Sequence, residues 1–108
     1  MVWYGKFKEL KDAAWIKWMR KNKKRIEEVL IPGMKFIGVY IIINATADHD
    51  FEMWYEIDNW AVLDRERDNK KAEELNLEMF AEIGMPFEWM HTKFLRTLDD
   101  VKFMDFEV

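Results

Sequence analysis

The chain has 108 residues and a formal net charge of −4; half of its residues are hydrophobic and 16% are aromatic. It contains no cysteine, which excludes disulfide bonds and thiolate metal sites, and no apolar run approaches the roughly 20 residues of a membrane span. No apolar leader follows Met1, so we expect one cytoplasmic domain over residues 1–108 and no membrane partner.

The charge is unevenly distributed along the chain. Residues 1–35 hold ten Lys and Arg against four Asp and Glu, whereas the remainder holds seven against seventeen. The basic run Arg20–Arg25 would suit nucleic acid, but the acidic remainder would repel phosphate. We therefore expect a solvated helix face, or one turned toward the acidic half, and no nucleic-acid partner. The high apolar content favours burial against a second copy, which predicts a homodimer.

The first predicted elements are a strand, a helix and a second strand. Val2–Lys8 begins with the aromatic and β-branched residues typical of a strand. From Glu9 to about Ile31, apolar residues recur at three- and four-residue steps, which predicts a helix ended by Pro32 and Gly33. Lys35–Asn44 is the strongest strand signal, and both of its faces are apolar. The helical stripe comprises Leu10, Ala13, Ala14, Met19, Ile26, Val29 and Leu30.

A hairpin partner strand is predicted after the turn Ala45–Asp50. Phe51–Ile57 alternates, so that its odd positions match the β-branched face of the preceding strand and would pack beneath helices with Ile37 and Val39. The even positions carry two acids and a tryptophan, more than solubility requires, and we expect this face to line a cavity. Gly38 lies on it, as expected where a ligand or another backbone comes close. The residues of this face are Tyr40, Glu52, Trp54 and Glu56.

The second half of the chain reads as two helices and a last strand. Asp58 or Asn59 is expected to cap a helix that begins at Trp60 and is exposed or interrupted over the polar residues 64–71. An apolar stripe then returns and Gly84 is a natural stop. The segment "PFEWMHTKFL" predicts a further helix, and Val101–Val108 a final strand. The stripes are Ala72, Leu75, Met79 and Ile83 in the first case, and Phe87, Met90, His91, Phe94, Leu95 and Leu98 in the second.

This order of elements predicts an α+β fold of the ferredoxin-like βαββαβ type. The sheet would be antiparallel, with helices on one face and an extra helix before the last strand.

The chain resembles the dimeric α/β-barrel superfamily, which includes the antibiotic-biosynthesis monooxygenases, EthD-like proteins, muconolactone isomerases and stress-responsive A/B-barrel proteins. The resemblance rests on element order and centres on "GMKFIGVYIII" followed by "HDFEMWYEIDNWAVLD". It implies that two sheets form a barrel with helices outside, and that each subunit has a cleft between its sheet and its helices. Glu52, Trp54, Glu56 and Tyr40 would then face the barrel interior or the dimer interface. The reverse assignment stays open, because both faces of Lys35–Asn44 are apolar.

Two residues are candidates for proton transfer. Glu52 and Glu56 lie about 13 Å apart along one strand, too far to act as a retaining pair of carboxylates, which needs about 5 Å. Glu52 alone would be a general base if burial raised its pKa, although an ion pair with Lys or Arg is the commoner role. His91 would be a general base, or an axial haem ligand as in some relatives; a core histidine satisfied by a carbonyl is commoner.

His49 lies between Asp48 and Asp50, but consecutive residues rarely converge on one ion, so we expect a solvated turn and no metal site. Nor is there a phosphate loop, a nucleophile elbow or an HExxH motif. The first functional hypothesis is a homodimer that binds a small hydrophobic or aromatic molecule without a cofactor, as a binding protein, monooxygenase or isomerase. Tyr40, Trp54 and Trp60 would shape its pocket, with Glu56 beside them. The alternative is a non-catalytic assembly protein whose sheet face only makes the oligomer.

Overall fold

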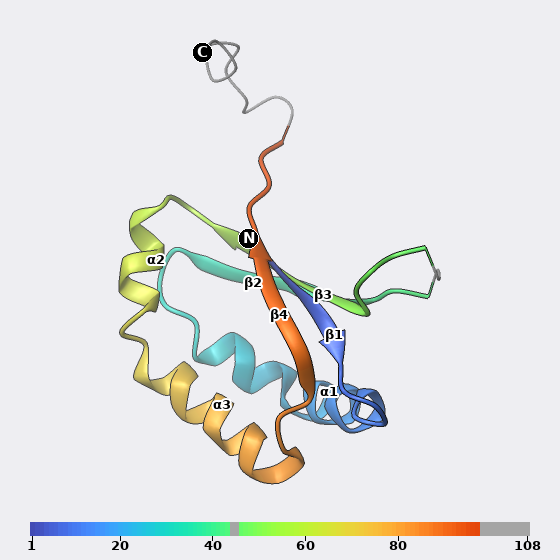
Figure 1. Cartoon of the computed structure of the whole chain (residues 1–108). Coiled ribbons are helices and arrows are strands. Elements are labelled where there is room, and N and C mark those ends of the chain that lie inside the picture. The colour runs from blue at the N-terminus through green and yellow to red at the C-terminus, as the bar shows by residue number, and fades with distance from the viewer. Residues whose placement is uncertain (44–45, 98–108) are drawn as a thin grey trace.

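The computed structural model describes residues 1–43 and 46–97 (Figure 1). Four strands and three helices follow one another along the chain. They are β1 (Val2–Phe7), α1 (Asp12–Glu28), β2 (Met34–Ile41), β3 (Phe51–Ile57), α2 (Ala61–Glu66), α3 (Lys70–Ile83) and β4 (Phe87–Lys93).

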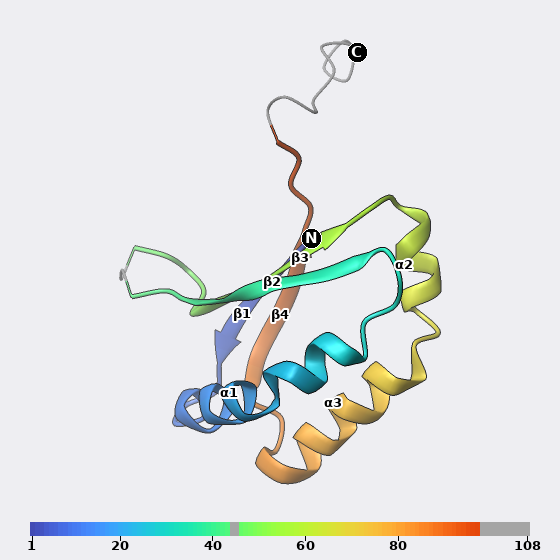
Figure 2. The same cartoon turned by 180° about the vertical axis from the view of Figure 1, so that it is seen from behind.

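The strands form one open antiparallel sheet in the order β2-β3-β1-β4. Helices α1 and α3 lie on the same side of this sheet, and α2 follows β3 at the end of the sheet remote from the β2–β3 loop (Figures 1 and 2). The predicted α+β class is confirmed, and the strand order is consistent with a ferredoxin-like fold. Such a sheet has one face packed on helices and one face that the described helices leave uncovered.

The core lies between the sheet and the two long helices. Its centre is a group of four aromatic rings: Phe51 is fully buried, and its ring centroid lies 4.8 Å from that of Trp15 and 5.0 Å from those of Phe7 and Phe87. Each such ring removes about 150–250 Å² of surface from water, so the four rings are a major source of the stability of the core. Gly5 allows β4 to approach β1 closely at this point. A Cβ on residue 5 would lie 2.4 Å from the carbonyl oxygen of Trp89 in β4.

The helix predicted from "PFEWMHTKFL" is wrong, because Phe87–Lys93 forms the edge strand β4. Phe7 pairs with Phe87 and Lys6 with Trp89, so Glu88 is an extra residue in β4. This bulge puts Phe87 and Met90 on the same face of the sheet at a three-residue spacing, which imitates the period of a helix. The predicted final strand Val101–Val108 lies outside the described residues.

Smaller predictions also need correction. Leu10 does not belong to the stripe of α1: it has a positive φ of 63° and is 88% exposed in the turn before the helix. Neither Asp58 nor Asn59 caps α2 through its side chain; Trp60 holds the N-cap position. The interruption after α2 is confirmed, and there Asn69 caps α3 by accepting a hydrogen bond from the Ala72 N–H. Gly33 and Gly84 have the positive φ expected of a turn and a helix stop.

Candidate functional site

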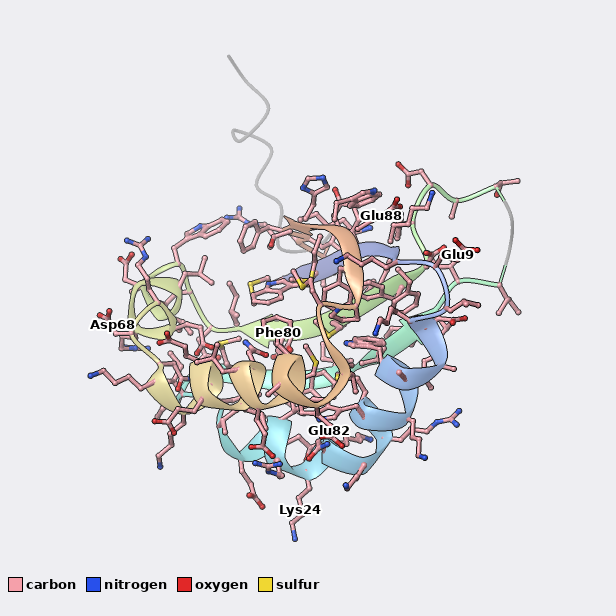
Figure 3. All side chains as sticks on the ribbon, turned by 60° about the horizontal axis from the view of Figure 1, so that its bottom comes forward. Glu9, Lys24, Asp68, Phe80, Glu82 and Glu88 are labelled. Atoms are coloured by element: carbon pink, nitrogen blue, oxygen red, sulfur yellow. The ribbon has the colours of Figure 1, made fainter. Side chains whose placement is uncertain are left out.

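The helix-covered face of the sheet contains a cavity of about 120 Å³ between the strands and the helices α1 and α3. Its walls are mainly apolar and rich in aromatic and methionine side chains, with Glu66 and Asn76 also in the lining. Trp3 and Tyr55 reach it from the central strands β1 and β3, since alternation turns these odd positions toward the helices. In Figure 3 Phe80 of α3 lies between the helix and the sheet. Further lining residues include Trp15, Trp18, Met19, Met53, Leu75, Met79 and Met90.

Three polar groups stand out in this apolar lining. The Trp3 indole Nε1–H is buried and has no hydrogen-bond acceptor within the described part of the chain. Burial, together with the Glu66 carboxylate, raises the pKa of the Tyr55 hydroxyl to about 12. Glu66 also lines the cavity and accepts a hydrogen bond from Asn69 at 3.0 Å. The cavity lining therefore includes a neutral phenol and one carboxylate, and the unpaired N–H belongs to one of its lining residues.

The open face of the sheet carries a hydrogen-bond network centred on Glu52 of β3. Its Oε1 accepts from Trp54 Nε1 at 2.9 Å. Its Oε2 lies 2.8 Å from His49 Nε2 and 3.3 Å from Lys93 Nζ, which comes from the other edge of the sheet. These hydrogen bonds, that of His49 first, hold the pKa of the Glu52 carboxyl below its usual range. Glu52 is thus a fixed anion and a weak proton acceptor.

His49 holds the end of the β2–β3 loop against the sheet. Its Nδ1 lies 2.8 Å from the Asp48 carboxylate while Nε2 faces Glu52. Both ring nitrogens can donate only in the imidazolium form, and the two contacts, that of Asp48 first, raise the pKa of His49. The ring also stacks beside Tyr4, with centroids 4.9 Å apart. The sequence prediction of a solvated turn is wrong for His49, whose side chain is largely buried.

Aromatic rings surround the Glu52 network on the same face. Tyr4 has its centroid 6.1 Å from Trp89 and 6.0 Å from His91, and Lys93 Nζ lies 5.2 Å over the Tyr4 ring. Toward β2, the rings of Tyr40 and Trp54 lie edge to face, with their centroids 6.0 Å apart. The open face is therefore an aromatic surface with an ion-paired centre.

The structure brings together four of the six residues singled out from the sequence. Glu52, Trp54, Tyr40 and His91 share the open face of the sheet, across its full width. His91 is exposed on it beside Trp89, at 4.8 Å between centroids, and its strand turns it away from Met90 and from the apolar environment that a helix would have given it.

The other two lie outside this group. Glu56 is on the same open face further along β3, where it is exposed. Trp60 is 58% exposed at the start of α2, and its ring centroid lies 4.8 Å from that of Phe94. None of the six residues lines the cavity on the helix side.

Several residues of both sites were not predicted from the sequence. Trp3 and Tyr55 lie at odd positions of their strands, which indicates the face beneath the helices. This pattern does not indicate that the Trp3 indole lacks an acceptor among the described residues. Lys93 lay within the segment interpreted as a helix, so its approach to Glu52 depends on a pairing that only the fold shows. The clue to His49 was its place between two aspartates.

The described residues contain neither a metal-binding cluster nor a membrane-spanning helix. Within residues 1–43 and 46–97, no group of three or more His, Asp or Glu side chains is arranged to hold a metal ion. Over the same ranges, no helix combines the length and apolarity of a membrane-spanning segment.

Comparisons with known proteins return no relative. No family model matches the chain, and neither a curated protein nor a solved structure is significantly similar to it.

Proposed function

We propose that the protein binds a small apolar or aromatic molecule carrying one hydrogen-bond acceptor in the cavity between the sheet and α1/α3. The observation that carries the proposal is that Trp3, a lining residue, has a buried indole Nε1–H with no acceptor among residues 1–43 and 46–97. A buried donor left unpaired costs about 1–3 kcal/mol, so such groups in folded proteins are nearly always satisfied. An acceptor on a bound molecule would satisfy it.

The size and lining of the cavity suit a ligand of about one ring. An engineered apolar cavity of about 150 Å³ in another protein binds benzene, and the present cavity of about 120 Å³ is slightly smaller. Its methionines adapt their shape more readily than branched side chains do, which accommodates a range of small ligands.

The proposal is for binding, not for proton transfer by Glu52 or His91. Both side chains lie on the open face, on the opposite side of the sheet from the cavity, and the pKa of Glu52 is lowered where a general base needs it raised. The carboxylate that a ligand in the cavity would meet is Glu66. A cofactor-free isomerisation or oxygenation in this cavity would use that group.

The test compares anisole with ethylbenzene, two rings of nearly equal size of which only anisole carries an ether oxygen. Each is titrated into uniformly ¹⁵N-labelled protein, and the six indole N–H resonances are followed by heteronuclear NMR. We expect saturable shifts with both, and a downfield shift of the Trp3 indole with anisole only. Anisole should bind more tightly by about 1 kcal/mol, the typical net value of one hydrogen bond.

Two variants serve as controls for this titration. Trp3→Phe removes the donor, so both probes should then bind equally well. Trp89→Phe makes the same replacement on the open face and should keep the preference for anisole. Absence of saturable shifts with either probe, or a preference that survives in Trp3→Phe, would contradict the proposal.

We propose in addition that two copies associate through their open sheet faces. The observation that favours this is the aromatic surface there: Tyr40 is 52% exposed, and Trp54 and Trp89 lie on the same face with no described helix above them. Exposed aromatic surface of this kind is typical of interfaces, and a twofold contact would bring identical faces together. If the cavity binds nothing, this face supports the alternative function, a non-catalytic assembly protein whose sheet face only makes the oligomer.

Light scattering after size exclusion tests the association. We expect a dimer for the native chain, and a monomer for the double variant Tyr40→Glu/Trp89→Glu, which places four charges in a twofold contact. Leu77→Glu is the matched control, since Leu77 is an exposed apolar residue of α3 on the opposite side of the molecule. A monomeric native chain at high micromolar concentration would contradict the dimer and leave the cavity proposal untouched.

A further inference from the structure

A second hollow lies between α1 and the edge strand β2, and unlike the cavity it has basic residues in its lining. It is a groove of about 280 Å³, and it shares only the side chains of Met19 and Ile26 with the cavity. Its floor is apolar and one rim is basic. The lining residues are Met19, Arg20, Lys23, Ile26, Phe36, Gly38, Val39 and Tyr40.

The basic rim is uncompensated within the described residues. Arg20 and Lys23 lie one turn apart on α1, and neither forms an ion pair with a described residue. Arg25 on the same helix differs, because its guanidinium binds both oxygens of Glu78 at 2.7 and 2.6 Å. The rim therefore holds two cations available to a negatively charged partner, directly beside apolar surface.

The other wall of the groove is a free strand edge. β2 is the outermost strand on this side, and in the described part of the chain it pairs only with β3. Ile37, the extra residue at its register shift, is 47% exposed, and Ile41 is 41% exposed. An edge of this kind offers unpaired backbone donors and acceptors to another chain.

Gly38 keeps the space beside this edge open. A Cβ added to it would meet nothing nearer than the Tyr40 ring at 3.8 Å, so the glycine is not required by close packing within the chain. The expectation that another part of the backbone approaches Gly38 is therefore wrong for the described residues. What the glycine provides is room on a strand edge that faces solvent.

We propose that this groove binds an extended peptide of mixed acidic and apolar sequence, which adds to β2 as a further antiparallel or parallel strand. Strand addition satisfies the free edge through main-chain hydrogen bonds, and side chains on the helix side enter the groove. Alternate positions of the peptide face the groove, so the fitting sequence has an apolar residue for the floor and an acidic one for Arg20 and Lys23 at successive groove-facing positions.

The probe is the acetylated and amidated peptide Thr-Val-Thr-Glu-Thr-Val-Thr-Glu, which carries Val and Glu in turn on one face. It is titrated into the full-length ¹⁵N-labelled chain. We expect saturable binding with shifts concentrated in the amides of β2 and in the neighbouring turn of α1. A peptide with Lys in place of Glu should bind at least about tenfold more weakly, because it meets Arg20 and Lys23 with like charge.

Matched variants separate the groove from the general charge of the helix. Arg20→Glu/Lys23→Glu should weaken binding of the Glu peptide at least about tenfold. Lys17→Glu/Lys24→Glu makes the same charge change on α1 outside the groove lining and should weaken it by no more than about threefold, through screened long-range attraction. Figure 3 shows Lys24 pointing outward from the helix. Circular dichroism of each variant checks that it is folded.

Three results would overturn the proposal. The first is equal binding of the Glu and Lys peptides, or no binding of either. The second is an equal loss in the two double variants. The third is undiminished binding of a peptide in which two Thr are replaced by Pro, since Pro lacks the N–H that strand addition requires. None of these results bears on the cavity proposal, which is tested by different probes.

Discussion

The helix-covered and open faces of the sheet are built from alternate residues of the same strands, yet different forces stabilise them. Phe51, Met53 and Tyr55 of β3 turn into the apolar layer under α1 and α3, where stability follows from the area removed from water. Glu52 and Trp54, their neighbours in sequence, belong to a hydrogen-bond network that depends on geometry and on charge. Substitutions on the first face should therefore act through volume, and those on the second through protonation and hydrogen bonding.

The largest expected effect is that of truncation in the aromatic centre of the core. Phe51→Ala removes a fully buried ring that packs on Phe7, Trp15 and Phe87, and we expect it to lower the free energy of unfolding by about 3–5 kcal/mol. Urea denaturation followed by tryptophan fluorescence measures this. Tyr40→Ala, which truncates an aromatic residue of the open face, should cost less than about 1 kcal/mol in the monomer. Equal losses would show that the two faces do not differ in this way.

The next effect concerns Tyr55, the one ionisable group buried on the helix side of β3. Burial raises its pKa to about 12, whereas the unfolded chain has the usual value near 10. Between pH 10 and pH 12 the unfolded chain has lost this proton while the folded chain keeps it. The contribution of Tyr55 to the free energy of unfolding is therefore complete below pH 10 and is lost as the pH rises to 12. We expect the loss to approach about 2–3 kcal/mol. Tyrosinate absorbance should show a late-titrating group that disappears in Tyr55→Phe, together with most of the pH dependence between pH 10 and 12.

The sequence predicted the layout of the β2–β3 hairpin well because its signal is local. Alternation in Phe51–Ile57 separates two faces whatever the rest of the chain does, and the structure confirms Val39, Met53 and Tyr55 beneath the helices and Tyr40, Glu52 and Trp54 opposite. The prediction was wrong for Ile37, which is the extra residue of a bulge in β2. Local alternation does not reveal such a bulge.

Non-local pairing limited what could be predicted elsewhere. β4 was interpreted as a helix because the bulge at Glu88 gives Phe87 and Met90 a helical spacing, and only the pairing of this segment with β1 shows the strand. For the same reason the sequence pointed to Glu52 but not to Lys93, its partner from β4. A donor that finds no acceptor in the described part of the chain, such as Trp3 Nε1, is a property of packing and has no signature in the sequence.

On the open face, the strongest effect should come from the carboxylate at the centre of the network. Glu52→Gln removes the charge that His49, Trp54 and Lys93 contact, and we expect a loss of about 1–2 kcal/mol in the free energy of unfolding at pH 6. Glu56→Gln makes the same change at an exposed position of the same strand and should alter stability by less than about 0.5 kcal/mol. Chemical denaturation of both variants provides the comparison. A similar result for the two glutamates would mean that the network contributes no more than a surface charge does.

The smallest effect is the pH dependence that His49 confers on this face. Its pKa is raised by Asp48 and Glu52, so the folded state keeps the proton at a pH where the unfolded state has already lost it. The stabilisation is therefore complete below the unfolded value of about 6.5 and is lost as the pH rises through the higher value of the folded state.

We expect His49→Gln to lower stability by about 1 kcal/mol at pH 5.5 and to remove this decline above pH 6.5, with denaturation midpoints measured at half-unit intervals. His91→Gln is the matched control on the same face, since His91 contacts the rings of Tyr4 and Trp89 and no carboxylate within the described residues. The Glu52→Gln variant should show a weaker decline than the native chain, because only Asp48 then remains opposite the imidazolium. A decline that persists unchanged in His49→Gln would assign the pH dependence to other groups and contradict the role of His49 as a protonated link between the β2–β3 loop and the sheet.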